Sequence, residues 1–320
     1  MAPRRPFVVD PVLTAVAVGY RNEAQTLIAD RVLPRVQVGG ERFKWTEYPL
    51  EQAFNIPETK VGRRGQVNQL EFSGTEKTDS VDDHGLETPI PLSDIDAAAT
   101  SRAEKRSSYD PEAHSTMMLM DTVLNVREAR VAALVQDANN YAAGRKVTLA
   151  GNSQFSDYAN SDPITVIKTA LEGTLVYRPN TLAMGQPVWS KLSSHPAIVN
   201  AIRGNLTNKG VVTREEFAAL FEVKDVLVGE GYINTAKPGQ PASLARAWGK
   251  HLSAIFVNPM AHPEQGITFG MTAQYGSRIS GRIEDPDVGL QGGVRIRTGE
   301  RIKELIVAKD VGYFVQNAVA

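Results

Sequence analysis

Hydrophobic positions recur at helical spacing through one stretch longer than any other in the chain, from Asp110 to Gly144. Asp110 supplies a side-chain acceptor at the N-cap, and Pro111 suits the first helical position because no N–H donor is needed there. The pattern predicts a continuous helix over residues 111–143, about 50 Å long, with one buried face. The residues of that face are Met117, Met120, Leu124, Val131, Leu134, Ala138 and Tyr141, with Leu119, Val123, Val126 and Val135 widening it.

Membrane spans and coiled coils also produce apolar runs of this length. The charged residues Asp121, Arg127, Glu128 and Arg130 lie in the middle of the run, which makes a membrane span too costly. Arg127 would also occupy a core position of a coiled coil. We therefore interpret the run as a long helix that lies across a sheet.

The chain before this helix is poor in apolar anchors. We interpret residues 1–40 as an arm. We interpret residues 41–91 as a long polar hairpin, in which apolar and polar residues alternate at Phe43 to Trp45 and at Val67 to Phe72. The tip of the hairpin is Gly62-Arg63-Arg64-Gly65, which is basic and favours a turn. Because so few apolar residues cannot offset the entropy of ordering the hairpin, we expect it to pack on another surface.

A short helix precedes the long one, and the second half of the chain mixes helix and strand patterns. Ser93 with Asp96 resembles a capping box and predicts the short helix, to about Arg106. A loop rich in Gly, Asn and Ser ends at Pro163 and marks a boundary. Beyond it we expect helices at 164–174, 188–202 and 214–221, and strands at 181–184, 225–229, 252–257, 294–298, 302–308 and 311–319. This order has no βαβ regularity and predicts an α+β fold.

Composition narrows the class of protein. Of the 320 residues, 42% are hydrophobic and 22% charged, which is typical of globular proteins. The chain has no Cys, which excludes disulfides, thiolate metal sites and Cys nucleophiles. The net charge of −1, from 35 basic and 36 acidic residues, provides no global positive field for DNA. The apolar segment near the N-terminus is too short for a secretory signal, so we expect a cytosolic protein.

The motifs that could carry chemistry are weak. Gly229-Glu230-Gly231 follows an expected strand but lacks the third Gly of a dinucleotide fingerprint, and we interpret it as a turn. Asp82-Asp83-His84 could hold a divalent cation, although a hydrated acidic loop fits the same residues. We therefore expect no catalytic, cofactor-binding or metal-binding residues.

Six stretches, taken in order, resemble the major capsid proteins of tailed bacteriophages, which have the Hong Kong 97 fold. They are VLPRVQV (32–38), VLNVREARVAALVQDANNY (123–141), RPNTLAMGQPVWSKLSSHPAIVNAI (178–202), TREEFAALFEVKDVLVGEGYINTA (213–236), AWGKHLSAIFVNP (247–259) and residues 312–320. These are packing and turn motifs, and no single one identifies the family. The resemblance rests on the order in which they follow one another. Residues 260–310 match nothing in the family pattern.

The resemblance implies a division of the chain into five regions. These are an N-terminal arm (1–40), an extended hairpin loop (41–91), a peripheral domain with the spine helix (92–150), a mainly axial domain (151–290) and C-terminal strands that return to the peripheral domain (291–320). Because the sequence begins at the arm, scaffolding would come from a separate protein or a cleaved segment.

The resemblance also implies a structural protein of the virion, not an enzyme, assembled in the host cytoplasm. Its copies would form hexamers and pentamers and close an icosahedral head around double-stranded DNA, contacted without sequence preference. Further implied partners are scaffolding, portal and decoration proteins, with no membrane and no cofactor. An encapsulin-type shell with protein cargo is the alternative within this fold, and a cytosolic α+β enzyme is the alternative of another class.

The extended loop supplies the candidate subunit-interface residues, Trp45, Phe54, Arg63 and Arg64. Family members lay this loop across the adjacent subunit, and we expect the same here. Arg63 and Arg64 lie between two Gly at the turn, where they would project furthest and pair with carboxylates of a neighbouring copy.

Overall fold

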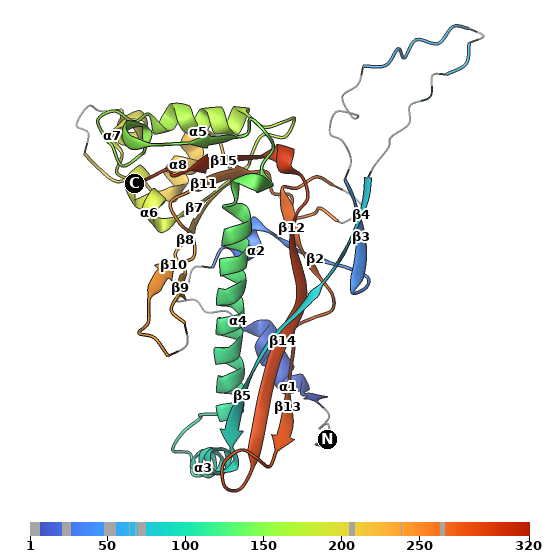
Figure 1. Cartoon of the computed structure of the whole chain (residues 1–320), viewed down its shortest axis with the longest axis vertical. Coiled ribbons are helices and arrows are strands. Elements are labelled where there is room, and N and C mark those ends of the chain that lie inside the picture. The colour runs from blue at the N-terminus through green and yellow to red at the C-terminus, as the bar shows by residue number, and fades with distance from the viewer. Residues whose placement is uncertain are drawn as a thin grey trace.

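The computed structural model is organised around α4 (Pro111–Val135), which runs beside a long sheet and below an upper layer of helices and strands (Figure 1). The structure describes residues 7–20, 27–47, 56–63, 65–67, 69, 75–204, 209–237, 239–262 and 266–320. The start of α4 is confirmed, because the Asp110 carboxylate accepts hydrogen bonds from the N–H groups of Glu112 and Ala113 at 3.0 and 3.4 Å.

The end of α4 differs from the prediction. The helix stops at Val135 rather than at Ala143, because side chains further along bond to its last carbonyl groups. The Asn140 amide donates to the carbonyl of Leu134 at 2.8 Å, and the Tyr141 hydroxyl donates to that of Val135 at 2.7 Å. Asn side chains compete with helical backbone bonds in this way. The apolar positions past Val135 therefore lie in and beside a short 3-10 helix (Ala138–Asn140) and not in α4.

The buried face of α4 follows the predicted stripe in its centre. Met120, Leu124 and Val131 are buried, whereas Met117 is only partly buried and Val126 is exposed. The same face carries two buried charged residues that the hydrophobic pattern did not predict, and they are described below.

The long sheet is built from both ends of the chain. Its central strand is β14 (Gly293–Ile306), which pairs antiparallel with β13 (Ile279–Asp285), β12 (Gly270–Gln274) and β5 (Asp82–Pro91). The arm adds β1 (Val8–Val9) beside β13 and β2 (Arg35–Gln37) parallel to β12. We expected two strands where β14 is continuous, and we assigned no element to β12 and β13.

Short helices of the arm and of the lower end of the molecule pack against α4 and the long sheet. Two helices of the arm, α1 (Pro11–Gly19) and α2 (Ala29–Val32), contact α4. At the lower end, α3 (Leu92–Ala103) lies where a short helix was predicted (Figure 1). The predicted capping box is wrong, because Pro91 is the N-cap and makes no side-chain hydrogen bond.

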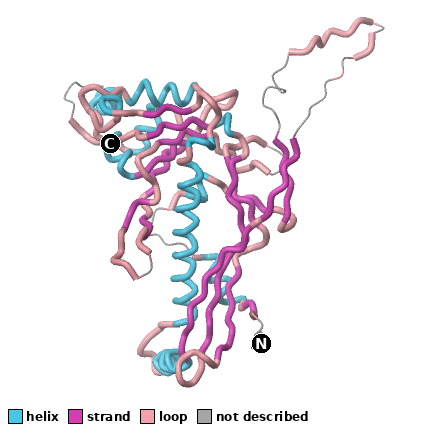
Figure 2. The backbone as a smooth tube through the Cα atoms, viewed as in Figure 1, coloured by secondary structure: helices cyan, strands magenta, loops and turns pink. Residues whose placement is uncertain are grey.

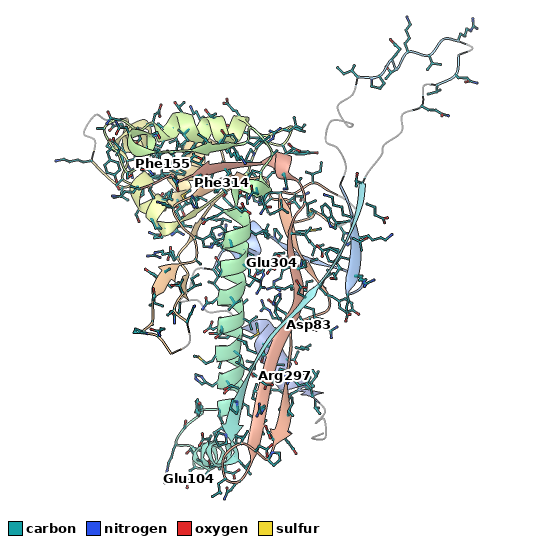
Figure 3. All side chains as sticks on the ribbon, viewed as in Figure 1. Asp83, Glu104, Phe155, Arg297, Glu304 and Phe314 are labelled. Carbon is teal, nitrogen blue, oxygen red and sulfur yellow. The ribbon has the colours of Figure 1, made fainter. Side chains whose placement is uncertain are left out.

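The upper layer is a five-stranded sheet with helices packed on it (Figure 2). Its strand order is β6 (Lys146–Thr148), β15 (Gly312–Gln316), β11 (Leu252–Ile255), β7 (Thr181–Gly185) and β8 (Asp225–Gly229). The helices are α5 (Pro163–Glu172), α6 (Gln186–Leu192), α7 (Pro196–Arg203) and α8 (Arg214–Phe221), and a hairpin of β9 (Tyr232–Asn234) and β10 (Leu244–Arg246) projects below. Phe155 and Phe314 are fully buried in this layer (Figure 3).

The single helix predicted at 188–202 is two helices, separated at His195. His195 is 1% exposed and is the N-cap of α7, where its Nδ1 accepts the N–H of Ala197 at 3.2 Å. Its Nε2 lies 3.0 Å from the Ser161 hydroxyl oxygen. That hydroxyl donates to the carbonyl of Asp157, so it accepts the Nε2 proton. These bonds require a neutral imidazole, and burial lowers the pKa of His195, outweighing the opposing charge of Asp162.

We expect Leu124→Ala to lower the free energy of unfolding by about 2–5 kcal/mol, because truncation leaves a cavity on the buried face of α4. Met118→Ala on the same helix is the matched control, because Met118 is 55% exposed and its truncation costs about 0.5 kcal/mol or less. Urea unfolding of the soluble subunit measures both. Equal losses would mean that the Leu124 side chain is not packed.

Acid should destabilise the subunit through His195. The folded-state pKa is lowered, so the contribution of neutral His195 is complete above about pH 6.5 and is lost as the pH falls toward the folded-state value. The change His195→Asn keeps an acceptor for the N-cap and removes the titration. The melting temperature of the wild type should therefore fall more than that of the variant between about pH 7.5 and about pH 5.5. A parallel fall in both proteins would contradict this assignment.

Candidate assembly surfaces

A buried polar network at the middle of α4 positions the arm and both layers. Arg127 is 1% exposed, and its guanidinium donates to the Asp30 carboxylate at 2.6 Å and to the Thr272 hydroxyl at 3.0 Å. Asp30 belongs to α2 and Thr272 to β12, so this one side chain joins the spine helix, the arm and the long sheet. Glu304 of β14 lies 3.8 Å from Arg127 and faces α4 (Figure 3).

The network continues from Asp30 into the sheet. Asp30 also pairs with Arg35 at 2.7 Å, and Arg35 pairs with Glu300 at 2.7 Å. Burial disfavours the charge on Asp30, but Arg127 and Arg35 outweigh it and lower the pKa of this carboxyl. Glu300 has no exposed side-chain surface and also pairs with Arg278 at 3.2 Å. The charges are therefore compensated within the fold and do not form an open site.

Glu128, the next residue of α4, holds the arm and the upper layer by hydrogen bonds instead of ion pairs. Its carboxylate accepts the N–H groups of Ile28 and Ala29 at 2.9 and 2.8 Å, and the indole N–H of Trp248 at 2.5 Å. Burial raises the pKa of Glu128 by more than these bonds lower it. The Trp248 ring packs against Gly229, where an added Cβ would lie 2.0 Å from a ring carbon. Gly229, the last residue of β8, thus serves packing, and the segment that we interpreted as a turn joins β8 to β9.

The base of the extended loop is anchored in its own chain. β3 (Arg42–Glu47) pairs antiparallel with β4 (Thr75–Ser80), so the first predicted arm of the hairpin is confirmed and the second lies further along than we predicted. Trp45 is 7% exposed and packs with Phe43 against the sheet, and Lys77 lies over its ring at 5.0 Å. We expected Trp45 at a subunit interface. Its burial within the subunit makes it an anchor of the loop instead.

The described part of the loop extends away from the body, at the upper right of Figure 1. The described residues from 56 to 69 are all exposed, and Ile56 is 99% exposed. A turn forms where we predicted it, since Gly65 N–H donates to Gly62 O at 2.8 Å, and Arg63 lies in this turn. Phe54 and Arg64, the two other candidate interface residues, lie outside the described residues. Arg63 is thus presented to solvent at the tip.

The candidate cation ligands have other partners. Asp82 pairs with Lys303 at 2.9 Å and Asp83 with Arg301 at 3.3 Å, on the outer face of β14. Over the part of the chain that the structure describes, no three His, Asp or Glu side chains are placed to hold a metal ion. Within the same residues, no helix is long and apolar enough to cross a membrane.

A cavity of about 900 Å³ lies beside the polar network, between α1, α2, α4 and the turn after β12. Four guanidinium groups line it, those of Arg31, Arg35, Arg127 and Arg278. Each of them lies within ion-pair distance of a carboxylate. The cavity is therefore part of the internal network, and we assign it no ligand.

The chain and the major capsid protein of Pseudomonas phage JBD67 are 46% identical over 315 residues, which cover 98% of each. This chain belongs to the phage major capsid proteins. No protein-family model matches the sequence. The relationship favours the phage capsid over the encapsulin-type shell and the cytosolic enzyme, and it places the capsid subunit in the virion.

Solved structures share the fold of this capsid subunit. A phage-related protein from Bordetella bronchiseptica RB50 matches it with a TM-score of 0.74 and 23% identity over 98% of both chains. The capsid of cyanophage P-SCSP1u matches with a TM-score of 0.55 and 12% identity over 93% of this chain and 90% of the other. The Hong Kong 97 fold and the α+β class that we predicted are confirmed.

Sequence reasoning missed the residues that hold the capsid subunit together. From the sequence we interpreted Arg127 and Glu128 as charges that exclude a membrane span, and Arg127 also as a charge that disfavours a coiled coil. A signal was present, because the spacing puts Arg127 at a core position of the apolar stripe. A charged residue at such a position indicates a buried partner when the chain is otherwise globular.

We expect Arg127→Met to lower the free energy of unfolding of the capsid subunit by about 3–5 kcal/mol, because the buried network loses its shared cation. Arg106→Met is the matched control, since the Arg106 side chain is 77% exposed and pairs with Glu104. Its loss should cost about 1 kcal/mol or less. Chemical unfolding of both variants tests this, and an Arg127→Met midpoint equal to that of the wild type would refute a central role for the network.

Proposed function

We propose that copies of this subunit tile a closed icosahedral head, through hexamers and pentamers, around double-stranded DNA. The family supports self-association, because capsid proteins assemble into multimeric shells. The observation that carries the proposal is the extended loop, whose base is anchored in its own chain by the buried Phe43 and Trp45, while its described residues from 56 to 69 are exposed. Exposed apolar side chains on such a loop need a second surface to cover them.

The division into regions is part of this proposal. The arm (1–40) and the loop (41–91) lead into a peripheral domain with the spine helix (92–150), followed by a mainly axial domain (151–290) and returning strands (291–320). The long sheet and α4 support the peripheral region, and the five-stranded upper layer supports the axial one. β5 adds the last residues of the loop region to the long sheet.

The remaining partners follow from the same proposal. Assembly takes place in the host cytoplasm with scaffolding, portal and decoration proteins, and the subunit has no enzymatic role. The net charge of −1 supports contact with packaged DNA that is weak and without sequence preference. Basic side chains would act there locally, by neutralising phosphates.

Amide hydrogen exchange on free subunits and on assembled particles tests the role of the loop. We expect residues 56–67 to exchange rapidly in the free subunit and to become protected in particles, because a neighbouring copy then covers them. The amides of β14 between Val294 and Thr298 are the internal control, since that strand pairs with β13 and with β5 inside one chain. Equal exchange of 56–67 in both states, with particles confirmed by sedimentation, would exclude the loop from the subunit contact.

A further inference from the structure

β5 is held on β14 with little apolar packing (Figure 1). The two strands pair over ten residues, from Asp82 to Pro91, yet Ile90 is the single buried residue of β5. β4, which precedes β5, has no buried residue. Because buried apolar side chains are what fixes the register of a strand, the register of β5 is weakly fixed. A shift of two residues would leave each side chain on its own face of the sheet.

Ion pairs on the outer face of the sheet hold β5 in the observed register. Glu87 lies opposite Arg297 and pairs with it at 2.7 Å. It also pairs with Arg295 at 3.1 Å. Asp83 lies opposite Arg301 and pairs with it at 3.3 Å. Each of these side chains is at least 34% exposed, and ion pairs that water reaches stabilise a structure only weakly.

The basic side chains of β14 continue past these pairs. If β5 moves by two residues toward the end of β14, Asp83 comes to lie opposite Lys303. Glu87 comes to lie between Arg297 and Arg301 on the same face. Opposite charges that face each other across two strands attract, so both carboxylates keep basic partners after the move.

The inner face of β14 also accepts the shifted strand. Ile90 lies opposite Val294, and both pack in one cluster with Ile296. After the move Ile90 would lie opposite Ile296, and Leu92, which is 39% exposed at the start of α3, would lie opposite Val294. The N–H of Leu92 already donates to the carbonyl of Gly292 at 3.0 Å, so pairing extends past the last residue of β5. The shift therefore buries one more apolar side chain.

The start of α3 shows the same offset of two residues. In the structure Pro91 is the N-cap and makes no side-chain hydrogen bond, and Ser93 does not cap the helix. After the move Ser93 would occupy the place of Pro91, with Asp96 three residues further on. That is the spacing of a capping box, in which the Ser hydroxyl accepts the N–H of the third helical residue. The sequence thus carries the cap of a helix that begins two residues later.

One contact opposes the shift. Asp82 would lie opposite Glu304, which is 9% exposed and pairs with Arg130 at 2.8 Å. Like charges directly opposite each other on a sheet are destabilising. This repulsion makes the observed register the more populated one.

We infer that β5 has two registers on β14, two residues apart, and that α3 begins at Leu92 in one and at Asp94 in the other. The shift moves β5 by about 6.8 Å along β14. Two residues that pass from helix to strand supply about 3.8 Å of this distance. A displacement of α3 supplies the rest, and no buried residue of α3 resists it.

The second register extends the reach of the loop. β4 moves with β5, and the ion pair between β3 and β4, Lys44 with Glu76, is exposed at both ends. The chain ahead of β4 therefore advances toward the extended loop by about 6.8 Å. This consequence rests on the proposed shell, in which pentamers and hexamers place the loop in different surroundings. Two registers would let one sequence serve both.

Disulfide trapping in the full-length subunit tests the two registers, because the chain has no Cys of its own. Asp83→Cys with Arg301→Cys are opposite in the observed register, and Asp83→Cys with Lys303→Cys in the shifted one. Opposite residues lie about 4.5–5.5 Å apart between Cα atoms, within disulfide range, whereas diagonal ones lie about 7–8 Å apart. We expect both pairs to cross-link in a glutathione buffer, the first faster, as measured by mass spectrometry without reduction.

The matched control is Glu87→Cys with Arg295→Cys. These residues would be opposite only if β5 moved by two residues in the other direction. The shifted pair should cross-link at least about tenfold faster than this diagonal control. Equal rates would mean that β5 has one register and would overturn the inference. Reduced variants with the wild-type circular dichroism spectrum show that the fold is kept.

A second measurement removes the cap that only the shifted register uses. Ser93→Ala should slow cross-linking of the Asp83 and Lys303 pair about fivefold and leave the Asp83 and Arg301 pair unchanged. Ser101→Ala in the same helix is the control, because Ser101 is the N-cap in neither register, and it should change neither rate. An unchanged rate for the shifted pair in Ser93→Ala would contradict the start of α3 at Asp94 and refute the second register.

The outcomes for the registers and for the proposed shell are separate, because trapping uses the free subunit. If the shifted pair does not cross-link above the control while the wild type forms particles, the second register is refuted and the proposed shell stands. If both registers are trapped and the wild type forms no particles under any assembly condition, the two registers stand and the proposed shell is refuted.

Discussion

Two adjacent charged residues in the middle of an apolar helix face hold this subunit together. Arg127 reaches toward the arm and the long sheet, and Glu128 accepts N–H groups from the arm and from Trp248 below the upper layer. Removing either partner would strand a buried charge or buried donors, which costs more than the pair itself contributes. Directional bonds of this kind fix one arrangement of arm, spine and layers, whereas apolar packing alone tolerates several. The position of the extended loop depends on that arrangement.

The local sequence predicted those elements whose ends are set by nearby residues. Asp110 with Pro111 begins α4, and Thr213 with Glu216 caps α8, which matches the predicted helix at 214–221. Elements that depend on distant residues were not predicted. The end of α4 is set by Tyr141, whose ring stacks on Phe269 and Phe314 from elsewhere in the chain. β12 and β13 owe their place to pairing with β14, and short strands of this kind carry little signal of their own.

The same distinction applies to the candidate interface residues. The turn around Arg63 follows from two nearby Gly, so its position could be predicted from the sequence. We predicted Trp45 at an interface because the hairpin has too few apolar residues to indicate an anchor in its own chain. Its partners, such as Val36 and Met271, lie in the arm and in β12, and no local pattern indicates that they meet.

Because the arm pairs with strands near the other end of the chain, contact order is high. Arg35 and Glu300 are 265 positions apart in sequence yet lie in one ion pair, and β2 adjoins β12. Closing such loops is entropically costly and slows folding. The long sheet cannot be completed on the ribosome until its last strands have emerged, so the nascent chain exposes unpaired strand edges for most of its synthesis. Chaperones and a low expression temperature should therefore raise the yield of soluble subunit. Their effect on that yield should be larger than the effect of the stability of the folded subunit.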